Sequence, residues 1–187
     1  MAGGSLDRTL SDFGAFDEAV IVKYLKQIIL GVAYLHENRV IHRDLKGANV
    51  LLDSTGQRVR LADFGAAARL AAQVTGAGEF RNDMQGTVAF MAPEVVRGDH
   101  YGRRCDIWSI GCVIIQMATG QPPWGFYDVT NSFALIYKIA TTKEPPPVPE
   151  FPKMPALRDL ALRCLEVEPG DRPQAKELLK HSLWQTL

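Results

Sequence analysis

The sequence has no excess of charge of either sign. Its 187 residues include 21 Lys plus Arg and 21 Asp plus Glu. Nucleic acids and anionic membrane surfaces attract basic proteins, so this balance argues against either as the main partner. We find no apolar run of the about 18 to 20 residues that a membrane-spanning helix needs, and the start does not resemble a secretory signal. We therefore expect a cytoplasmic protein that is not inserted in a membrane.

Cysteine is also scarce. Cys105, Cys112 and Cys164 are odd in number, lie in apolar helical surroundings and show no short metal-ligand spacing. Such residues are typical of reduced, buried thiols in an intracellular protein. The length and the 47% hydrophobic content suit one globular domain with a sizeable core.

The hydrophobic pattern predicts a mainly helical chain. A helix is expected over residues 16–36, because Val22, Leu25, Ile29 and Val32 recur at three- and four-residue steps. Residues 66–91 have little periodicity, which predicts a mobile surface segment. Further helices are expected at 106–119, which should be buried, and at 132–139, 155–164 and 174–179. Short strands forming two small hairpins are expected at 40–41, 50–52 and 58–62.

Residues 42–49 contain the set of side chains that phosphate transfer requires. Asp44 can orient a substrate hydroxyl and accept its proton, Lys46 can offset the charge of the moving phosphoryl group, and Asn49 can ligate a divalent ion. The alternative is an ordinary surface aspartate in a turn. The spacing of the three residues favours the catalytic interpretation.

Asp63-Phe64-Gly65 lies nineteen residues after Asp44 and follows a strand-like run. Asp63 would be the second metal ligand, with Phe64 packed inward to hold it and Gly65 allowing a sharp turn. The same tripeptide occurs at Asp12-Phe13-Gly14, in a polar stretch before a helix, where we interpret it as a turn that connects helices. Position therefore makes the motif specific, because the tripeptide alone is a weak signal.

Three further residues are regulatory candidates. Arg43 could bind a phosphate added to the segment 66–91, with Thr75 as the candidate switch. Thr87 is expected to face Asp44 and Lys46 as a positioning residue. For both threonines an ordinary loop position remains the alternative.

Three other charged residues have predicted structural roles. Glu94 and Arg172 are expected to form an interior ion pair. Asp106 begins an apolar helix, so it should be hydrogen-bonded, and the backbone of His42 and Arg43 is the expected partner.

These motifs and their order resemble those of the eukaryotic protein kinases. Lys46 and residues 86–91 are similar to the serine/threonine kinases, and several segments resemble the MAP kinase kinase kinase group in particular. The resemblance rests on these segments: His42-Arg43-Asp44, Asp63-Phe64-Gly65, Ala92-Pro93-Glu94, 106–111, Asp171-Arg172-Pro173, 1–5, Gly47, 63–70, Pro122-Pro123-Trp124 and 178–181.

The resemblance implies a protein kinase domain over 1–187, with an activation segment at 63–94. The fold would be the C-terminal lobe of a kinase, mainly α-helical, with small β-hairpins carrying the catalytic and metal-binding loops. In the family an N-terminal β lobe precedes the position of Met1, and this chain does not contain it. The chain by itself is therefore expected to be inactive or very weak.

By resemblance, ATP and Mg²⁺ are the expected cofactors and a MAP kinase kinase is the expected protein substrate. Scaffold or regulatory proteins are possible further partners. The expected ATP-binding residues are Met1, Ser5, Lys46, Ala48, Asn49, Leu51 and Asp63. Two hypotheses remain open. The chain is part of an active serine/threonine kinase, or it is a catalytically silent module that binds kinases or serves as a scaffold.

Overall fold

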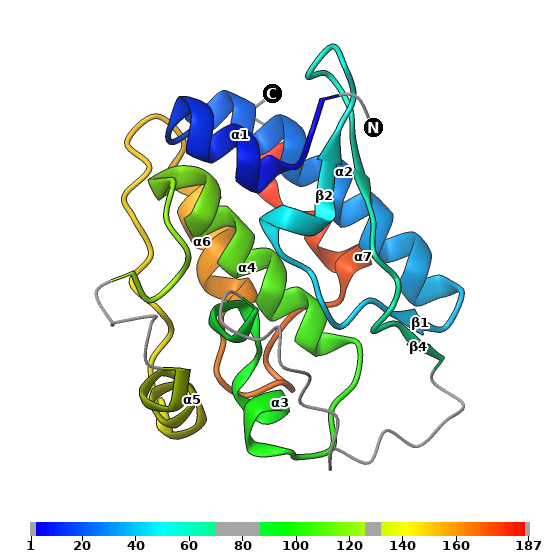
Figure 1. The fold of residues 1–187 in the computed structure, drawn as a ribbon, viewed down its shortest axis with the longest axis vertical. Coiled ribbons are helices and arrows are strands. Elements are labelled where there is room, and N and C mark those ends of the chain that lie inside the picture. The colour runs from blue at the N-terminus through cyan, green and yellow to red at the C-terminus, as the bar shows by residue number, and fades with distance from the viewer. Residues whose placement is uncertain (1–2, 70–86, 126–131, 186–187) are drawn as a thin grey trace.

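The computed structural model describes residues 3–69, 87–125 and 132–185. Two long helices run side by side through its centre: α2 (Glu18–Glu37) and α4 (Arg104–Thr119). The shorter helices and two small sheets are arranged around this pair (Figure 1). The expected mainly helical lobe is thus confirmed.

The first helix, α1 (Leu6–Phe13), was not predicted as a helix. It begins after Ser5, which caps the helix because its Oγ accepts a hydrogen bond from the backbone N–H of Arg8 at 3.2 Å. Gly14 ends the helix with φ of 80°, a conformation that glycine adopts without strain. The first Asp-Phe-Gly therefore lies at the junction of α1 and α2, although its first two residues are helical.

Helices α2 and α4 form the core. The predicted apolar stripe of α2 is buried, and residues 105–117 of α4 are all buried. Gly111 allows a close approach to the neighbouring chain, because a Cβ there would lie 2.5 Å from Leu165 Cγ. The close packing of α4 against Leu165 therefore depends on a glycine at this position.

By length and composition α2 could cross a membrane, contrary to our expectation that no segment reaches that length. Half of its most apolar window is buried inside the protein, however, and the core helix of a globular protein meets the same criteria. Length and hydropathy alone are therefore weak evidence that α2 crosses a membrane.

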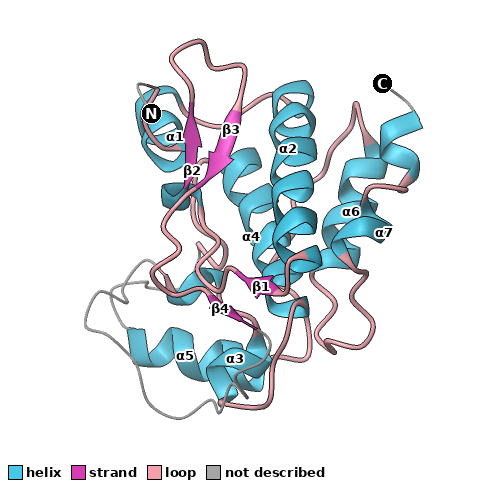
Figure 2. Cartoon of the chain, turned by 90° about the vertical axis from the view of Figure 1, so that its right-hand side faces the viewer, coloured by secondary structure: helices cyan, strands magenta, loops and turns pink. Residues whose placement is uncertain are grey.

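The strands form two separate antiparallel pairs. β2 (Val50–Leu52) and β3 (Val59–Leu61) make the predicted hairpin, with Val50 opposite Leu61. β1 (Val40–Ile41) pairs instead with β4 (Ala68–Arg69), which follows much later in the chain (Figure 2). The prediction of two hairpins was therefore half right.

The remaining elements complete the helical body. The expected boundaries agree with the observed ones to within two residues where a helix was predicted. The elements are η1 (Gly47–Asn49), η2 (Val88–Phe90), α3 (Pro93–Arg97), α5 (Ser132–Thr141), α6 (Pro155–Cys164), α7 (Ala175–Leu178) and η3 (Ser182–Gln185).

All three cysteines are buried as free thiols, as predicted. Burial raises the pKa of Cys105, Cys112 and Cys164, so these thiols stay protonated and unreactive in the folded protein.

Candidate active site

The loop between β1 and β2 brings Asp44, Lys46 and Thr87 together. Lys46 Nζ lies 3.1 Å from Asp44 Oδ2 and donates a hydrogen bond to Thr87 Oγ1 at 2.5 Å. Because Thr87 is more than forty residues further along the chain, this contact joins the loop to the segment before α3. The predicted position of Thr87 beside Lys46 is confirmed.

Asn49 holds Asp44 in place. Its Nδ2 donates to the backbone oxygen of Asp44 at 2.8 Å and to Asp44 Oδ2 at 2.9 Å. Both contacts use the amide nitrogen, so the amide oxygen of Asn49 is left as an acceptor. Asp44 Oδ1 is buried and has no hydrogen-bond partner. A buried carboxylate oxygen without a partner is costly unless a bound group supplies one.

Asp63 is placed beside this loop by the backbone. The N–H of Ala62 donates to the backbone oxygen of Asn49 at 2.9 Å, so Asp63 follows directly after a contact with the other predicted metal ligand. The Asp63 side chain is exposed, and its Oδ1 accepts a hydrogen bond from the N–H of Gly65 at 3.2 Å. The two predicted metal-binding residues thus come from adjacent backbone segments.

One detail of the Asp-Phe-Gly prediction was wrong. Phe64 is 48% exposed and does not pack inward, because its ring lies on the surface against His42, with the ring centroids 5.2 Å apart. The predicted turn at Gly65 is present, with the N–H of Ala67 donating to the Phe64 oxygen at 3.0 Å, and Asp63 just before it has a positive φ of 59°. The hydrogen bond from the Gly65 N–H to the Asp63 carboxylate stabilises this turn, as aspartate side chains commonly do.

Asp106 fixes the backbone of the catalytic loop, as predicted. Its Oδ2 accepts from the N–H of His42 and its Oδ1 from the N–H of Arg43, both at 2.9 Å. The sequence analysis missed His36, whose Nε2 lies 2.8 Å from the same Oδ2. Arg43 has φ of 69°, so the loop has a left-handed residue next to Asp44. This strained conformation is maintained by the fully buried Asp106.

Gln116 is a second missed residue. It lies in the apolar helix α4, where a buried amide requires partners. Its Oε1 accepts from the N–H of Gly47 at 3.1 Å and its Nε2 donates to Asp7 Oδ1 at 2.8 Å. A Cβ at Gly47 would lie 2.3 Å from that Oε1, so a larger residue there would displace the Gln116 side chain from this contact. A polar residue in a buried helix is the signal that could have identified it.

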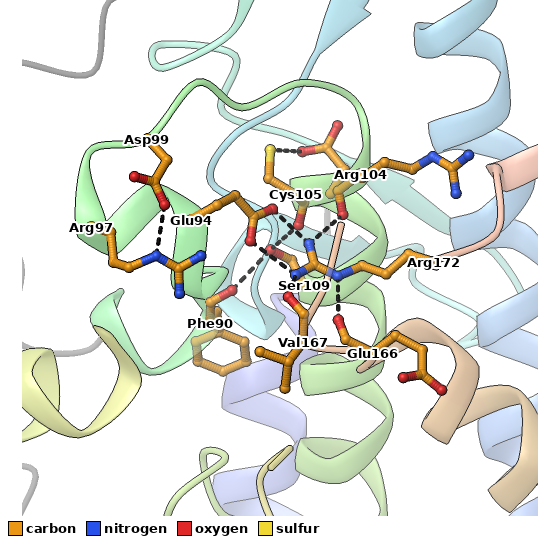
Figure 3. A network of polar contacts seen from close by, with 11 residues as sticks. Phe90, Glu94, Arg97, Asp99, Arg104, Cys105, Ser109, Glu166, Val167 and Arg172 are labelled. Carbon is orange, nitrogen blue, oxygen red and sulfur yellow. Dashed lines mark hydrogen bonds and ion pairs between the residues drawn. The ribbon is translucent and has the colours of Figure 1, made fainter. Parts of the chain in front are cut away.

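Glu94 and Arg172 form the predicted interior pair, shown in Figure 3. Two parallel contacts of 2.6 and 2.9 Å join the carboxylate to the guanidinium. Arg172 also donates to the backbone oxygens of Glu166, Val167 and Arg104. Because every side of the guanidinium has a partner, this pair anchors α3 to the helical body.

The predicted nucleotide-binding residues, except Met1, lie in the part of the chain that the structure describes. Ser5 and Leu51 are brought together by an isolated antiparallel bridge, and the N–H of Leu52 donates to the Gly4 oxygen at 2.9 Å. Ala48 is exposed on the same loop as Asn49. Met1 lies outside the described residues, as does the predicted switch Thr75.

Arg43, the predicted phosphate-binding residue, extends its guanidinium over the ring of Tyr101 at 5.4 Å. Its Nε is buried without a hydrogen-bond partner. Most of the segment 66–91, to which the added phosphate was assigned, lies outside the described residues. The role of Arg43 therefore stays a prediction.

This fold and this loop are those of the protein kinases. A family model described as "Protein kinase domain" matches residues 1–184, so the chain belongs to the protein kinase family. Mitogen-activated protein kinase kinase kinase 1 of Homo sapiens and of Mus musculus are each 58% identical to the chain over 186 residues. Mitogen-activated protein kinase kinase kinase 3 of Arabidopsis thaliana is 46% identical over 181 residues.

The match covers the whole of this chain but only part of these relatives. The alignments include 100% of the chain and 12% of the human and mouse proteins, and 96% of the chain and 27% of the Arabidopsis protein. The chain thus spans about an eighth of the length of the two mammalian proteins.

Proposed function

We propose that the chain forms the catalytic-loop lobe of an ATP-dependent serine/threonine protein kinase of the MAP kinase kinase kinase type. The reaction would transfer the ATP γ-phosphate to a serine or threonine of a MAP kinase kinase. The observation that carries this proposal is the contact set of Asp44 with Lys46 and Asn49. The names of the similar proteins support the substrate class.

The residues present suit Mg²⁺ and ATP. Mg²⁺ prefers oxygen ligands and is commonly bound through one or two carboxylates together with substrate phosphates. The amide oxygen of Asn49 and the exposed carboxylate of Asp63 provide such ligands from adjacent backbone segments. Bound Mg²⁺ would neutralise phosphate charge. Ser5, Ala48 and Leu51 would contact the nucleotide.

Asp44 would act on the substrate hydroxyl. Asn49 and Lys46 both contact its Oδ2, so the carboxylate is held in one orientation. Its Oδ1, which has no partner, can accept a hydrogen bond from a serine or threonine hydroxyl and then take the proton. Lys46 carries the positive charge that stabilises the transferred phosphoryl group. Its contact with Thr87 keeps the ammonium at this position.

The first experiment tests Asp44 in the full-length natural protein. Asp44→Asn is expected to lower kcat for phosphorylation of a MAP kinase kinase by about 10²- to 10⁴-fold, because the hydroxyl loses its proton acceptor. The KM for ATP should change little, since Asp44 does not contact the nucleotide. A variant with unchanged kcat would remove Asp44 from this role.

The second experiment uses the two Asp-Phe-Gly motifs as a matched pair. Asp63→Asn should raise the Mg²⁺ concentration required for half-maximal activity, because a charged ligand is replaced by a neutral one. Asp12→Asn makes the same chemical change at the end of α1 and should leave the Mg²⁺ dependence unchanged. Equal effects of the two variants would contradict the assignment of Asp63.

We also propose a cytoplasmic location. Three free, buried thiols support a reducing compartment. Expression of a fluorescent fusion of the full-length protein, followed by cell fractionation, tests this location.

A further inference from the structure

A cavity of about 740 Å³ lies apart from the residues assigned to phosphate transfer. Three segments distant in the sequence line it: the C-terminal end of α2 with the turn that follows, the first turn of α4, and the start of α7. Figure 2 shows α7 beside the end of α2 that leads into β1. The tertiary structure alone creates this cavity.

The lining is basic although the whole chain is neutral. Arg39, Arg103, Arg104 and Lys176 contribute positive charge, whereas Glu37 is the acidic residue of the lining. Lys176 Nζ lies 2.9 Å from Glu37 Oε1, so these two charges offset each other. Three further arginines, Arg39, Arg103 and Arg104, line the same cavity.

In the part of the chain that the structure describes, none of these guanidinium groups forms a hydrogen bond or ion pair with another side chain. Within residues 3–69, 87–125 and 132–185, the side chains of Arg39 and Arg103 form no hydrogen bond or ion pair. Arg104 contributes its backbone oxygen to Arg172, and its side chain runs away from that contact (Figure 3). Like charges held near one another repel, so a bound anion would stabilise this arrangement.

The start of α4 also borders this cavity. Arg103 occupies the N-cap of this 16-residue helix without a side-chain capping bond. The backbone N–H groups at the start of a helix carry partial positive charge that favours anions. Ile107, one turn further along, lines the same cavity, together with Ala33 and Ala175. The cavity therefore combines cationic side chains with small apolar walls.

We propose that this cavity binds a phosphate ester carrying at least two negative charges, through the guanidinium groups of Arg39, Arg103 and Arg104. Guanidinium groups bind phosphate oxygens in pairs of parallel hydrogen bonds. The volume falls in the range of about 300–1,000 Å³ that is typical of small-molecule sites, so a compact molecule with several phosphates fits better than one phosphate ion. His36, which also lines the cavity, contacts the Asp106 that holds the catalytic loop.

Calorimetric titration of the 187-residue chain tests the proposal, with inositol hexakisphosphate as the probe for a small phosphate ester. Inorganic phosphate and a short phosphoserine peptide form two further arms, because free and protein-bound phosphates offer the same chemistry. We expect saturable binding of one inositol hexakisphosphate per chain and weaker binding of the other two. Arg39→Gln and Arg103→Gln should each weaken this binding by about tenfold.

Arg60→Gln is the matched control. Arg60 is an exposed arginine on β3 that does not line the cavity, so its replacement changes the net charge equally. Arg39 has φ of 59°, and Arg39→Gly provides a second variant that removes the guanidinium where glycine suits the backbone. Thermal unfolding without the anion checks that each variant folds.

Three results would overturn the proposal. The first is no binding of inositol hexakisphosphate by the parent chain. The second is an equal loss of affinity in Arg60→Gln, which would indicate non-specific attraction. The third is tighter binding of the phosphoserine peptide, which would assign the cavity to a phosphorylated protein segment instead of a small molecule.

Discussion

Two carboxylate–cation pairs in this molecule have opposite environments. Glu94 and Arg172 are 3% and 0% exposed, and the guanidinium has a partner on every side. Asp44 and Lys46 are 18% and 21% exposed, and Asp44 Oδ1 has no partner. Every side-chain polar atom of the first pair has a partner, whereas the second pair keeps one carboxylate oxygen without one.

This difference in burial and pairing distinguishes an ion pair that stabilises the fold from one that can take part in a reaction. Removing one partner of a buried ion pair is strongly destabilising, because the other charge then stays buried without compensation. A partly exposed ion pair contributes less to stability, and a carboxylate oxygen without a partner can engage a substrate. Substitutions should therefore affect stability in one region and reaction rate in the other.

The largest stability effect is expected for Arg172→Met. It leaves Glu94 buried without a counter-charge, so the free energy of unfolding should fall by about 3–5 kcal/mol. Urea denaturation of the chain measures this change. The double variant Glu94→Gln/Arg172→Met should recover part of the loss, because neither charge remains. A single variant within about 1 kcal/mol of the parent would remove the contrast between the two pairs.

Asp106→Asn should have the next largest effect. The carboxylate accepts two backbone N–H groups and contacts His36, and an amide cannot accept at both positions. We expect a loss of about 2 kcal/mol in the free energy of unfolding. Hydrogen exchange at the amides of His42 and Arg43 should become faster. Asp99→Asn, at an exposed ion pair, serves as the control and should leave both amides unchanged.

Asp44→Asn should change stability little despite its large effect on kcat. Its free energy of unfolding is expected to stay within about 1 kcal/mol of the parent, because the pair with Lys46 is partly solvated. The same urea experiment measures this value. A loss comparable to that of Arg172→Met would show that the catalytic loop depends on this ion pair for its fold.

The smallest effect is a pH dependence at Asp159. Partial burial would raise the pKa of this carboxyl group, but hydrogen bonds from Arg163 and His181 outweigh it and lower the pKa. A lowered pKa in the folded state contributes stability above the unfolded value, and this contribution is lost as the pH falls through the folded value.

Asp159→Asn should therefore lower stability slightly at pH 7 and leave it unchanged at the acidic end of the transition. The residue is half exposed, so a change of only a few tenths of a kcal/mol is expected. Thermal unfolding across pH measures this dependence. A difference between variant and parent that grows on acidification would contradict the predicted sign.

Local sequence signals were sufficient for most of the helices. The buried stripe of α2 follows from apolar residues at three- and four-residue steps, and the all-apolar pattern of α4 predicts its central position. The pattern did not identify α1, because only Leu6 and Leu10 of its eight residues are buried. A short helix with two buried residues has too weak a periodicity to distinguish it from a polar loop.

For the active site, the sequence predicted which side chains matter better than how they lie. Asp44, Lys46 and Asn49 were identified from their spacing, and the structure brings them together as expected. Asp106 was identified as a charge at the start of an apolar helix, and it holds the backbone of His42 and Arg43 as predicted. The predicted inward orientation of Phe64 was wrong, because the exposure of a ring depends on which parts of the folded chain surround it.

The order of its polar motifs and the period of its apolar residues thus determined the protein kinase family, the helical lobe and the chemical residues of the catalytic loop. Only the tertiary structure decided that His36 and Gln116 hold this loop and that three arginines face one cavity. The physical reason is distance along the chain. Periodicity and spacing describe neighbours in sequence, whereas these contacts join residues that packing brings together from separate helices.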